Sequence, residues 1–314
     1  MVVVAGPTAS GKSETALRIA ERFSGEIVNC DAVQLYRGFD IGTAKTPVDA
    51  RRGIPHHLFD VLDPRERFSA GDYARIARNV IGAVSSRGQL PVIVGGTGFY
   101  LRALLDGLPS LPSRDEELRN RLAKREQRRP GSLHRMLLRL EPAAAARIHP
   151  RDVQKAMRAL EIRLLTRSAL PPQSEGRPLE GFRILQIGLA PERAQLAEAI
   201  AARTRRMFRE GFLEEVRNLL ASGLSGAEKP FESLGYRQAL AYLRGQLTRE
   251  QAMEATEIET RQYAKRQLTW FRRDSRILWF AGFGSHPPVS EAVLDAVRNF
   301  LSGGGVEKNL EAAR

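Results

Sequence analysis

Short runs of apolar, β-branched residues alternate along the chain with longer stretches of helical spacing. The runs are Val2 to Ala5, Glu26 to Cys30, Pro91 to Gly95, Ile184 to Ala190 and Ile277 to Phe280, and their length and composition predict buried strands. Between about 70 and 87, apolar residues recur at helical spacing, which predicts a helix. Further helices are expected from about 191 to 222 and from 249 to 273. This order predicts an α/β fold, a three-layer core with a mainly parallel sheet of about five strands.

A long Arg-rich segment of helical character separates the third run from the fourth. Pro109 and Pro112 precede it, and Pro171, Pro172 and Pro178 follow. We interpret residues 113–177 as an α-helical insertion domain, because proline clusters are typical of segment boundaries. The core would then consist of residues 1–112 and 178–302, and residues 303–314 are expected to form a frayed tail.

Composition favours a folded globular protein. Of the 314 residues, 42% are hydrophobic and 27% charged, and no apolar run reaches the roughly 20 residues of a membrane helix. The chain enters its first strand without a basic and apolar leader. We therefore expect a cytoplasmic protein with no membrane contact. The single cysteine, Cys30, excludes an internal disulfide and a zinc finger within the chain, and we expect it to be a small buried strand residue.

The charge is strongly and unevenly positive. The formal net charge is +13 and the pI is about 10.5. Residues 113–177 hold 16 Lys and Arg against 8 Asp and Glu, a surplus of +8. Such a segment is a candidate nucleic-acid surface. Solvated helices whose arginines extend over an apolar face would give the same pattern, so charge alone leaves both interpretations open.

The first strand leads directly into a phosphate-binding motif. The sequence GPTASGKS fits the pattern G-x-x-x-x-G-K-[ST] and precedes a helix-like stretch. In such loops, backbone N–H groups surround phosphate oxygens at a helix N-terminus. We expect Lys12 to meet the terminal phosphates and Ser13 to hold Mg²⁺. The candidate phosphate-binding residues are Gly6, Pro7, Thr8, Ala9, Ser10, Gly11, Lys12 and Ser13.

Two further candidates follow the second and third strands. Asp31 comes directly after the second strand, and Gly95-Gly96-Thr97-Gly98 ends the third. Both are expected at the carboxyl edge of the sheet, where the phosphate loop also opens. Asp31 could hold Mg²⁺ or act as a general base, and a turn or N-cap role is the alternative. The glycines suggest close approach to a ligand beside the Thr97 hydroxyl, unless they form a plain turn.

Other patterns are less specific. No aspartate ends the third strand as a Walker B motif would require, and no Asn-Lys-x-Asp motif occurs, which disfavours motor and GTPase functions. We expect structural roles for His56 and His57, because adjacent side chains diverge and no further ligand is near in sequence. The mixed basic and aromatic stretches 233–237 and 261–272 suit RNA contacts, and an amphipathic surface helix would explain the second equally well.

Taken together, these motifs resemble those of the tRNA dimethylallyltransferase (tRNA isopentenyltransferase) family. The resemblance is carried in order by GPTASGKS, DAVQLYRGFDIGTAKT, IPHHLFDVLDP, GGTGFYLRALLDG, ARIHPRDVQKAMRALEI, SLGYRQ and AKRQLTWFR. It spans nearly the whole chain. The phosphate loop is shared with many families, whereas the second, fourth and last stretches in this order are specific to this one.

The resemblance implies transfer of a dimethylallyl group from dimethylallyl diphosphate to N6 of the adenosine 3′ of the anticodon. Residues 6–13 and Arg203 would bind the diphosphate, with Mg²⁺ on Ser13. Asp31 would be the general base, and Thr97 would orient the amine and the diphosphate. The basic insertion would clamp the anticodon stem-loop of tRNA. The implied tRNA contacts are Asp31, Ala32, Val33, Gln34, Thr97, Arg119, Gln154, Lys155, Ala156, Met157, Arg158, Glu232, Ser233, Leu234, Gly235, Tyr236 and Arg237.

The chain departs from the family pattern at one site residue. Ala32 stands where serine is common, which removes a hydroxyl contact next to Asp31. The missing zinc-finger extension makes the chain resemble the bacterial members, and we expect a monomer with no obligate protein partner. Three other functions share some of the features: a P-loop small-molecule kinase, an adenylate isopentenyltransferase and a non-catalytic RNA-binding module. The first two leave the basic insertion unexplained, and the third leaves Asp31 and Thr97 unexplained.

Overall fold

The computed structural model describes residues 1–109, 111–170 and 176–303. Its contacts divide the chain into two compact units, residues 1–105 with 179 onward, and residues 106–178. We refer to them as the core unit and the helical unit. Prolines 171 and 172 and the expected tail beyond Gly303 lie outside the described residues.

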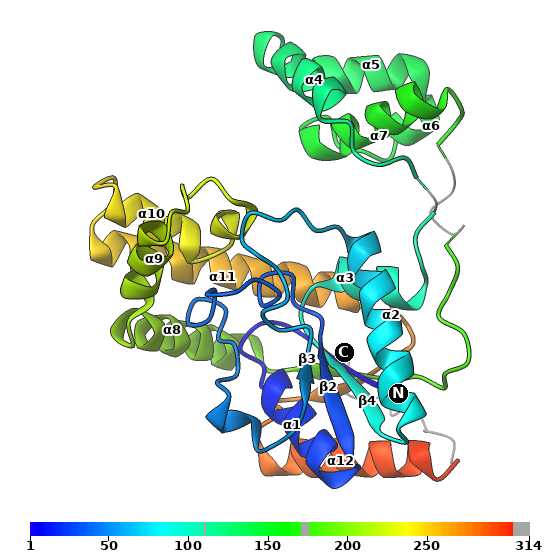
Figure 1. The fold of residues 1–314 in the computed structure, drawn as a ribbon, viewed down its shortest axis with the longest axis vertical. Helices are drawn as coiled ribbons and strands as arrows, with labels where there is room; N and C mark the ends of the chain where they lie inside the picture. Colours follow the sequence, from blue (N-terminus) through cyan, green and yellow to red (C-terminus); the bar gives the residue numbers. More distant parts are fainter. Residues whose placement is uncertain (110, 171–175, 304–314) are drawn as a thin grey trace. The chain divides into compact units, whose positions relative to one another are not determined.

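The core unit is built on one parallel sheet of six strands (Figure 1), which confirms the predicted α/β class. Strand order is β3-β2-β4-β1-β5-β6, and every neighbouring pair is parallel. The five predicted strands are all present, within one residue at each end. The sixth is an edge strand of two residues, too short to give a sequence pattern. The strands are β1 Val2–Ala5, β2 Gly25–Asn29, β3 His56–His57, β4 Leu90–Val94, β5 Leu185–Ala190 and β6 Ile277–Ala281.

Helices cover both faces of this sheet. Helices α1 and α12 pack on one face, where Val2, Val4, Ile187 and Leu189 meet Ala16 and Val293 in the main core cluster. Helices α2 and α3 cover the other face and bury Tyr73 and Ile81. The bounds of these four are α1 Lys12–Arg22, α2 Ala70–Ser86, α3 Gly98–Leu105 and α12 Pro287–Leu301.

A second group of core-unit helices follows β5. Helices α8 and α11 pack together through Leu196, Ile200 and Ala264, and α9 and α10 lie next to them in the yellow part of Figure 1. The bounds are α8 Arg193–Arg209, α9 Phe212–Ala221, α10 Tyr236–Leu243 and α11 Arg249–Phe271, with short 3₁₀ turns at Asp49–Arg51 and Lys229–Glu232.

The helical unit has its own apolar core. Leu122, Leu133, Leu137 and Leu160 are buried together from three of its helices. Asp115 and Asp152 begin two of these helices as N-caps, each accepting a backbone N–H three residues ahead, as short acidic side chains do at helix starts. The four helices are α4 Glu116–Arg128, α5 Ser132–Leu140, α6 Pro142–Ala145 and α7 Val153–Thr166.

Candidate active site

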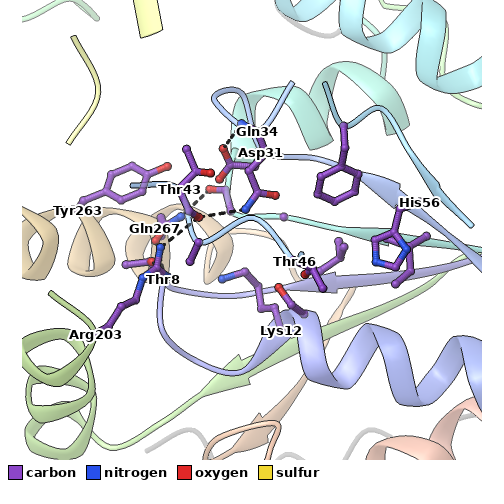
Figure 2. Close-up of a pocket in the computed structure, with 17 residues that line it drawn as sticks. Thr8, Lys12, Asp31, Gln34, Thr43, Thr46, His56, Arg203, Tyr263 and Gln267 are labelled. Carbon is purple, nitrogen blue, oxygen red and sulfur yellow. Dashed lines mark hydrogen bonds between the residues drawn. The ribbon is translucent and has the colours of Figure 1, made fainter. Parts of the chain in front are cut away.

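The carboxyl ends of β1, β2 and β4 open into one cavity of the core unit. Its empty volume, including the open mouth, is about 650 Å³. Figure 2 shows side chains from both ends of the sequence converging on it. The polar residues that line it are Thr8, Lys12, Ser13, Asp31, Gln34, Thr43, Thr46, His56, Arg203, Tyr263 and Gln267, and the others are Ile27, Ala44, Phe59, Val94, Gly95 and Gly96. The sequence motifs around Lys12, Asp31 and Thr97 thus meet at one edge of the sheet, as expected for parallel strands.

The phosphate loop owes its shape to residues with positive φ. Gly6 has φ 142° and Gly11 has φ 88°, while Ala9 takes the left-handed region at 63°. Gly11 begins α1, so the loop leads directly into a helix N-terminus. Lys12 Nζ donates to the Pro7 carbonyl at 2.5 Å, folding its side chain back over the loop. This arrangement is suited to holding an anion, because backbone N–H groups and the helix dipole act in the same direction.

Two cationic side chains reach this loop. Burial, followed by the nearby Arg203 guanidinium, lowers the pKa of Lys12 to about 7. Burial also lowers the pKa of Arg203. Arg203, on α8, donates to Thr8 Oγ1 at 3.0 Å and to the Thr43 carbonyl at 3.2 Å. Two like charges desolvated side by side are costly unless an anion sits between or beside them.

Asp31 is held in a tight turn after β2. Its Oδ1 accepts the backbone N–H of Val33 at 2.9 Å and of Gln34 at 3.3 Å. Buried Asn29 fixes the turn from behind, because its side chain accepts from Asp31 N and donates to the Asp31 carbonyl. Asp31 therefore has the turn role that the sequence offered as an alternative. The turn also places the carboxylate on the cavity, opposite Lys12 (Figure 2).

The three glycines around Thr97 make room for protein groups. A Cβ on Gly95 would collide with the Cys30 carbonyl, one on Gly96 with the Gln267 side chain, and one on Gly98 with the Trp270 indole. Thr97 Oγ1 accepts the Ala32 N–H at 3.0 Å, which ties this turn to the Asp31 loop. The glycines predict close approach to a ligand, whereas the groups that approach them here are the Cys30 backbone just after β2 and two side chains of α11.

The loop from Phe39 to Thr46, which sequence reasoning did not assign to the site, forms one wall of the cavity. Glu215 on α9 accepts the N–H groups of Asp40, Ile41 and Gly42, at 3.1, 2.6 and 3.3 Å, and the Tyr236 hydroxyl at 2.5 Å. Burial raises the pKa of Glu215 in spite of these bonds. These contacts place the Thr43 carbonyl where Arg203 and Gln34 both donate to it.

Buried Lys45 holds the same loop from its other end. Its ammonium donates to Asp40 and Asp60, both at 2.5 Å, and to the Tyr36 carbonyl at 3.0 Å. A desolvated ammonium with three oxygen partners is well compensated. The sequence signal for this contact is the run DIGTAK, because its Asp40 and Lys45 form an ion pair in the folded loop.

The oxygen donors of the cavity fit a hydrated Mg²⁺ rather than an all-protein metal cage. Ser13 and Asp31 both line it, while within the described ranges no three His, Cys, Asp or Glu side chains gather to hold a metal. Mg²⁺ is commonly held by one or two protein oxygens together with water and substrate phosphates. Ser13 and Asp31 can supply those oxygens.

The sequence candidates in the helical unit divide into buried and exposed residues. Arg119 and Arg158 both pair with the fully buried Glu161 carboxylate, at 3.1 and 2.7 Å. Burial would raise the pKa of Glu161, but Arg158, the Asp115 N–H and Arg119 hold that pKa below its usual value. Ala156 and Met157 are buried, whereas Gln154 and Lys155 are exposed. Both arginines are partly exposed, and their pairing with Glu161 makes them part of the unit's internal structure.

Candidates 232–237 show a similar division. Glu232 and Arg237 are exposed, Ser233 and Leu234 partly so, and Gly235 is buried. The Tyr236 ring is fully buried among Phe39, Phe212 and Phe231, with its hydroxyl on Glu215. Tyr236 therefore connects this segment to the cavity wall through Glu215.

The histidine pair and the cysteine have separate surroundings. His57 Nε2 pairs with the buried Glu26 carboxylate, which also pairs with Arg87, consistent with a structural role. His56 instead lines the cavity, and its Nδ1 lies 2.8 Å from the Ile54 carbonyl. Cys30 is buried just beyond the end of β2, and burial raises the pKa of its thiol to about 12. A thiol with that pKa is unreactive near neutral pH.

The fold and the cavity define an α/β protein of the phosphate-loop class, in which one carboxylate, that of Asp31, shares the cavity with Lys12 and Arg203. The profile of the IPP transferase family matches residues 34–274. The chain belongs to this family. It is 56% identical over 306 residues to the tRNA dimethylallyltransferase of Solibacter usitatus, covering 96% of this chain and 99% of that one. It is 51% identical to the one from Koribacter versatilis, covering 95% and 98%.

Solved structures agree with these relatives. The tRNA isopentenylpyrophosphate transferase of Bacillus halodurans is 34% identical, with a TM-score of 0.70, and the match covers 96% of this chain and 95% of that one. A eukaryotic dimethylallyltransferase solved while acting on tRNA is 25% identical, with a TM-score of 0.82, and the match covers 98% of this chain and 81% of that one. No described helix has both the length and the apolar character needed to cross a bilayer.

Proposed function

We propose that the chain transfers the dimethylallyl group of dimethylallyl diphosphate to N6 of the adenosine 3′-adjacent to the anticodon of tRNA. The observation that carries this proposal is that Asp31 and Lys12 line the same cavity from opposite sides. A base and an anion site facing each other suit displacement of a diphosphate by an amine. The names of the curated relatives supply the substrate class.

The chain's own residues account for the charge changes of the reaction. The N6 lone pair forms a bond to the allylic carbon, the carbon–oxygen bond breaks, and its electron pair leaves with the diphosphate. Asp31 accepts the N6 proton, as a positioned carboxylate can. Lys12, Arg203 and the N–H groups of residues 6–13 stabilise the charge on the leaving diphosphate. Thr97, whose hydroxyl already meets the Asp31 loop, orients the amine.

We propose Mg²⁺ as the metal, which Ser13 and the diphosphate would hold. When bound, the ion would neutralise charge on the leaving group. We also propose that the chain acts in the cytoplasm, as expected from its sequence. The target adenine would leave its stack to enter the cavity, at a cost that contacts within the site offset.

A P-loop kinase remains the main alternative activity, because the loop alone would also hold ATP. Two observations disfavour it. Strand β4 ends at Val94 and is followed by Gly95 and Gly96, without an acidic residue, and a separate basic helical unit has no role in phosphorylating a small molecule. An adenylate isopentenyltransferase likewise has no use for that unit.

Labelled dimethylallyl diphosphate tests the proposal directly. The chain is incubated with Mg²⁺, the labelled donor and unmodified tRNA bearing adenosine 3′ of the anticodon, with AMP and ATP as competing acceptors. Label in tRNA alone supports the proposal. Label in the nucleotides identifies an adenylate isopentenyltransferase, and ATP consumption without label transfer identifies a kinase.

A further inference from the structure

Gln267 connects two parts of the cavity that are far apart in sequence. It lies on α11, is only 5% exposed, and uses both ends of its amide. Its Oε1 accepts the Thr8 N–H at 2.8 Å, and its Nε2 donates to the Gly96 carbonyl at 2.8 Å. The partners fix the orientation of the amide, since an N–H requires the oxygen and a carbonyl requires the NH₂ group.

The surrounding contacts leave this amide little freedom. Gly96 is in such close contact with the Gln267 side chain that a Cβ there would collide with its nitrogen. One helical turn further along α11, the Trp270 indole occupies the space next to Gly98. Residues three apart lie on the same helix face, so one face of α11 packs against both glycines. We call residues 95–98 the GGTG turn.

The GGTG turn continues the connection to the base. Thr97 Oγ1 accepts the Ala32 N–H at 3.0 Å, and Thr97 N donates to the Cys30 carbonyl at 3.3 Å. On the other side, Thr8 is also bound by Arg203. A continuous path therefore runs from Arg203 and Thr8, through Gln267 and the GGTG turn, to the loop that carries Asp31.

We propose that Gln267 is a positioning residue that fixes the separation between the phosphate loop and the Asp31 loop. The proposal rests on the proposed function, because those two loops hold the leaving group and the base. The Gln267 amide binds backbone groups of both Thr8 and Gly96, so Gln267 would act by fixing where the phosphate loop and the Asp31 loop lie relative to each other. Misplacement by about 1 Å costs a group-transfer reaction about 100-fold.

Two substitutions separate the bonds from the packing. Gln267→Met keeps a similar volume and removes both hydrogen bonds, whereas Gln267→Glu keeps the acceptor for Thr8 and removes the donor to Gly96. The matched control is Gln262→Met, an exposed glutamine on the same helix. The transfer rate constant is measured in single turnover with enzyme in excess, so that it does not depend on the active fraction. Diphosphate and tRNA affinities and the melting temperature are measured in parallel.

We expect Gln267→Met to lower the transfer rate constant about 100-fold with diphosphate and tRNA affinities little changed, and Gln267→Glu to fall between it and the parent. An unchanged rate constant overturns the proposal, even if the melting temperature falls. A loss confined to diphosphate affinity overturns it as well, since Gln267 would then be a donor-binding residue. If the parent chain itself transfers no label to tRNA, the proposed function fails, and that result is distinct from these.

The contact with Gly96 gives an independent test. Gly96→Ala places a methyl group against the Gln267 amide and is expected to lower the same rate constant. Gln267→Ala opens that space, so the double variant is expected to lose no more than Gln267→Ala alone. Residues in contact show such non-additivity, whereas independent sites add. Additive losses would show that Gly96 and Gln267 act separately and would overturn the proposal.

Discussion

Burial and the neighbouring Arg203 disfavour the charged form of Lys12, and the Asp31 carboxylate across the cavity only partly offsets them. Burial and Arg203 lower the pKa of Lys12 to about 7, and its ammonium meets only the Pro7 carbonyl in the loop. A diphosphate in the loop supplies further negative charge close to Lys12, which raises the pKa of the ammonium. The affinity of the site for diphosphate is thus coupled to the protonation of one lysine.

This coupling predicts proton uptake. At pH 8, about one unit above the pKa of about 7, free Lys12 is mostly neutral, so binding of Mg²⁺-diphosphate should take up close to one proton at this site. Well below pH 7 the lysine is already charged and this uptake should vanish. Titration calorimetry in buffers of different ionisation enthalpy measures it. Lys12→Arg is the control, because its guanidinium stays charged. Equal uptake by both proteins would contradict the assignment.

Asp31 has both a structural and a chemical role, and substitution can separate them. Its Oδ1 accepts two backbone N–H groups, which Asn can still accept, whereas Asn cannot take the N6 proton. Asp31→Asn should lower the single-turnover transfer rate about 10²- to 10⁴-fold with tRNA affinity retained. Asp31→Ala should lose the turn as well and is the comparison. A rate near that of the parent in Asp31→Asn would remove Asp31 from proton transfer.

At the scale of elements, the apolar periodicity of the sequence predicts the longer strands and helices, whereas a strand too short to show a pattern cannot be predicted from it. The strands and α2 follow from apolar spacing over four to seventeen residues. Strand β3 has two residues, and its pairing depends on β2 rather than on its own pattern. Helix α12 was not anticipated, although Pro287 at its start and the spacing of Val293, Val297 and Phe300 are helix signals. The candidate residues before α1 and after β2 and β4 were found because motifs at strand ends are local.

The cavity wall from Phe39 to Thr46 shows why other site residues were not found. Its position is fixed by Glu215, which is 173 residues beyond Gly42 in the chain, and Gln267 reaches Thr8 across 259 residues. A single sequence contains no signal for a hydrogen bond at such separation. Only the folded arrangement shows that DIGTAK is held from α9.

Glu215 should therefore control the mobility of that wall. Glu215→Gln replaces one acceptor oxygen by a donor and leaves some of the N–H groups of residues 40–42 without a partner. We expect hydrogen–deuterium exchange to accelerate at those amides and the KM for the donor to rise. Glu214→Gln, an exposed neighbour paired with Arg217, is the control and should change neither. Unchanged exchange at 40–42 would show that packing of Phe39 and Gly42 against Tyr236 suffices to hold the loop.

At the scale of the molecule, the sequence shows the excess of positive charge in the helical unit. It does not show that two arginines pair with a buried carboxylate within the unit. Arg119 and Arg158 pair with buried Glu161, so neutralising them would leave a buried carboxylate unpaired, at a cost of several kcal/mol. Loss of RNA binding in such variants could therefore result from unfolding of the unit and would not demonstrate a lost RNA contact. The charges that can serve RNA without structural cost are the exposed ones.

Helix α4 carries four such side chains, and three of them, Lys124, Arg125 and Arg128, lie within its last two turns. Replacing all three with Gln should weaken tRNA binding and reduce the slope of log K against log salt by about 0.9 for each phosphate that the protein no longer neutralises. The control replaces three exposed core-unit residues, Arg75, Arg217 and Arg298, and so changes the net charge equally.

Equal weakening of tRNA binding in both proteins would mean that affinity depends only on the total charge of the protein and not on which unit carries the positive residues. An unchanged slope in the α4 variant would place the phosphate contacts on other helices. A reduced slope in the α4 variant alone would assign the anticodon stem-loop to this face of the helical unit.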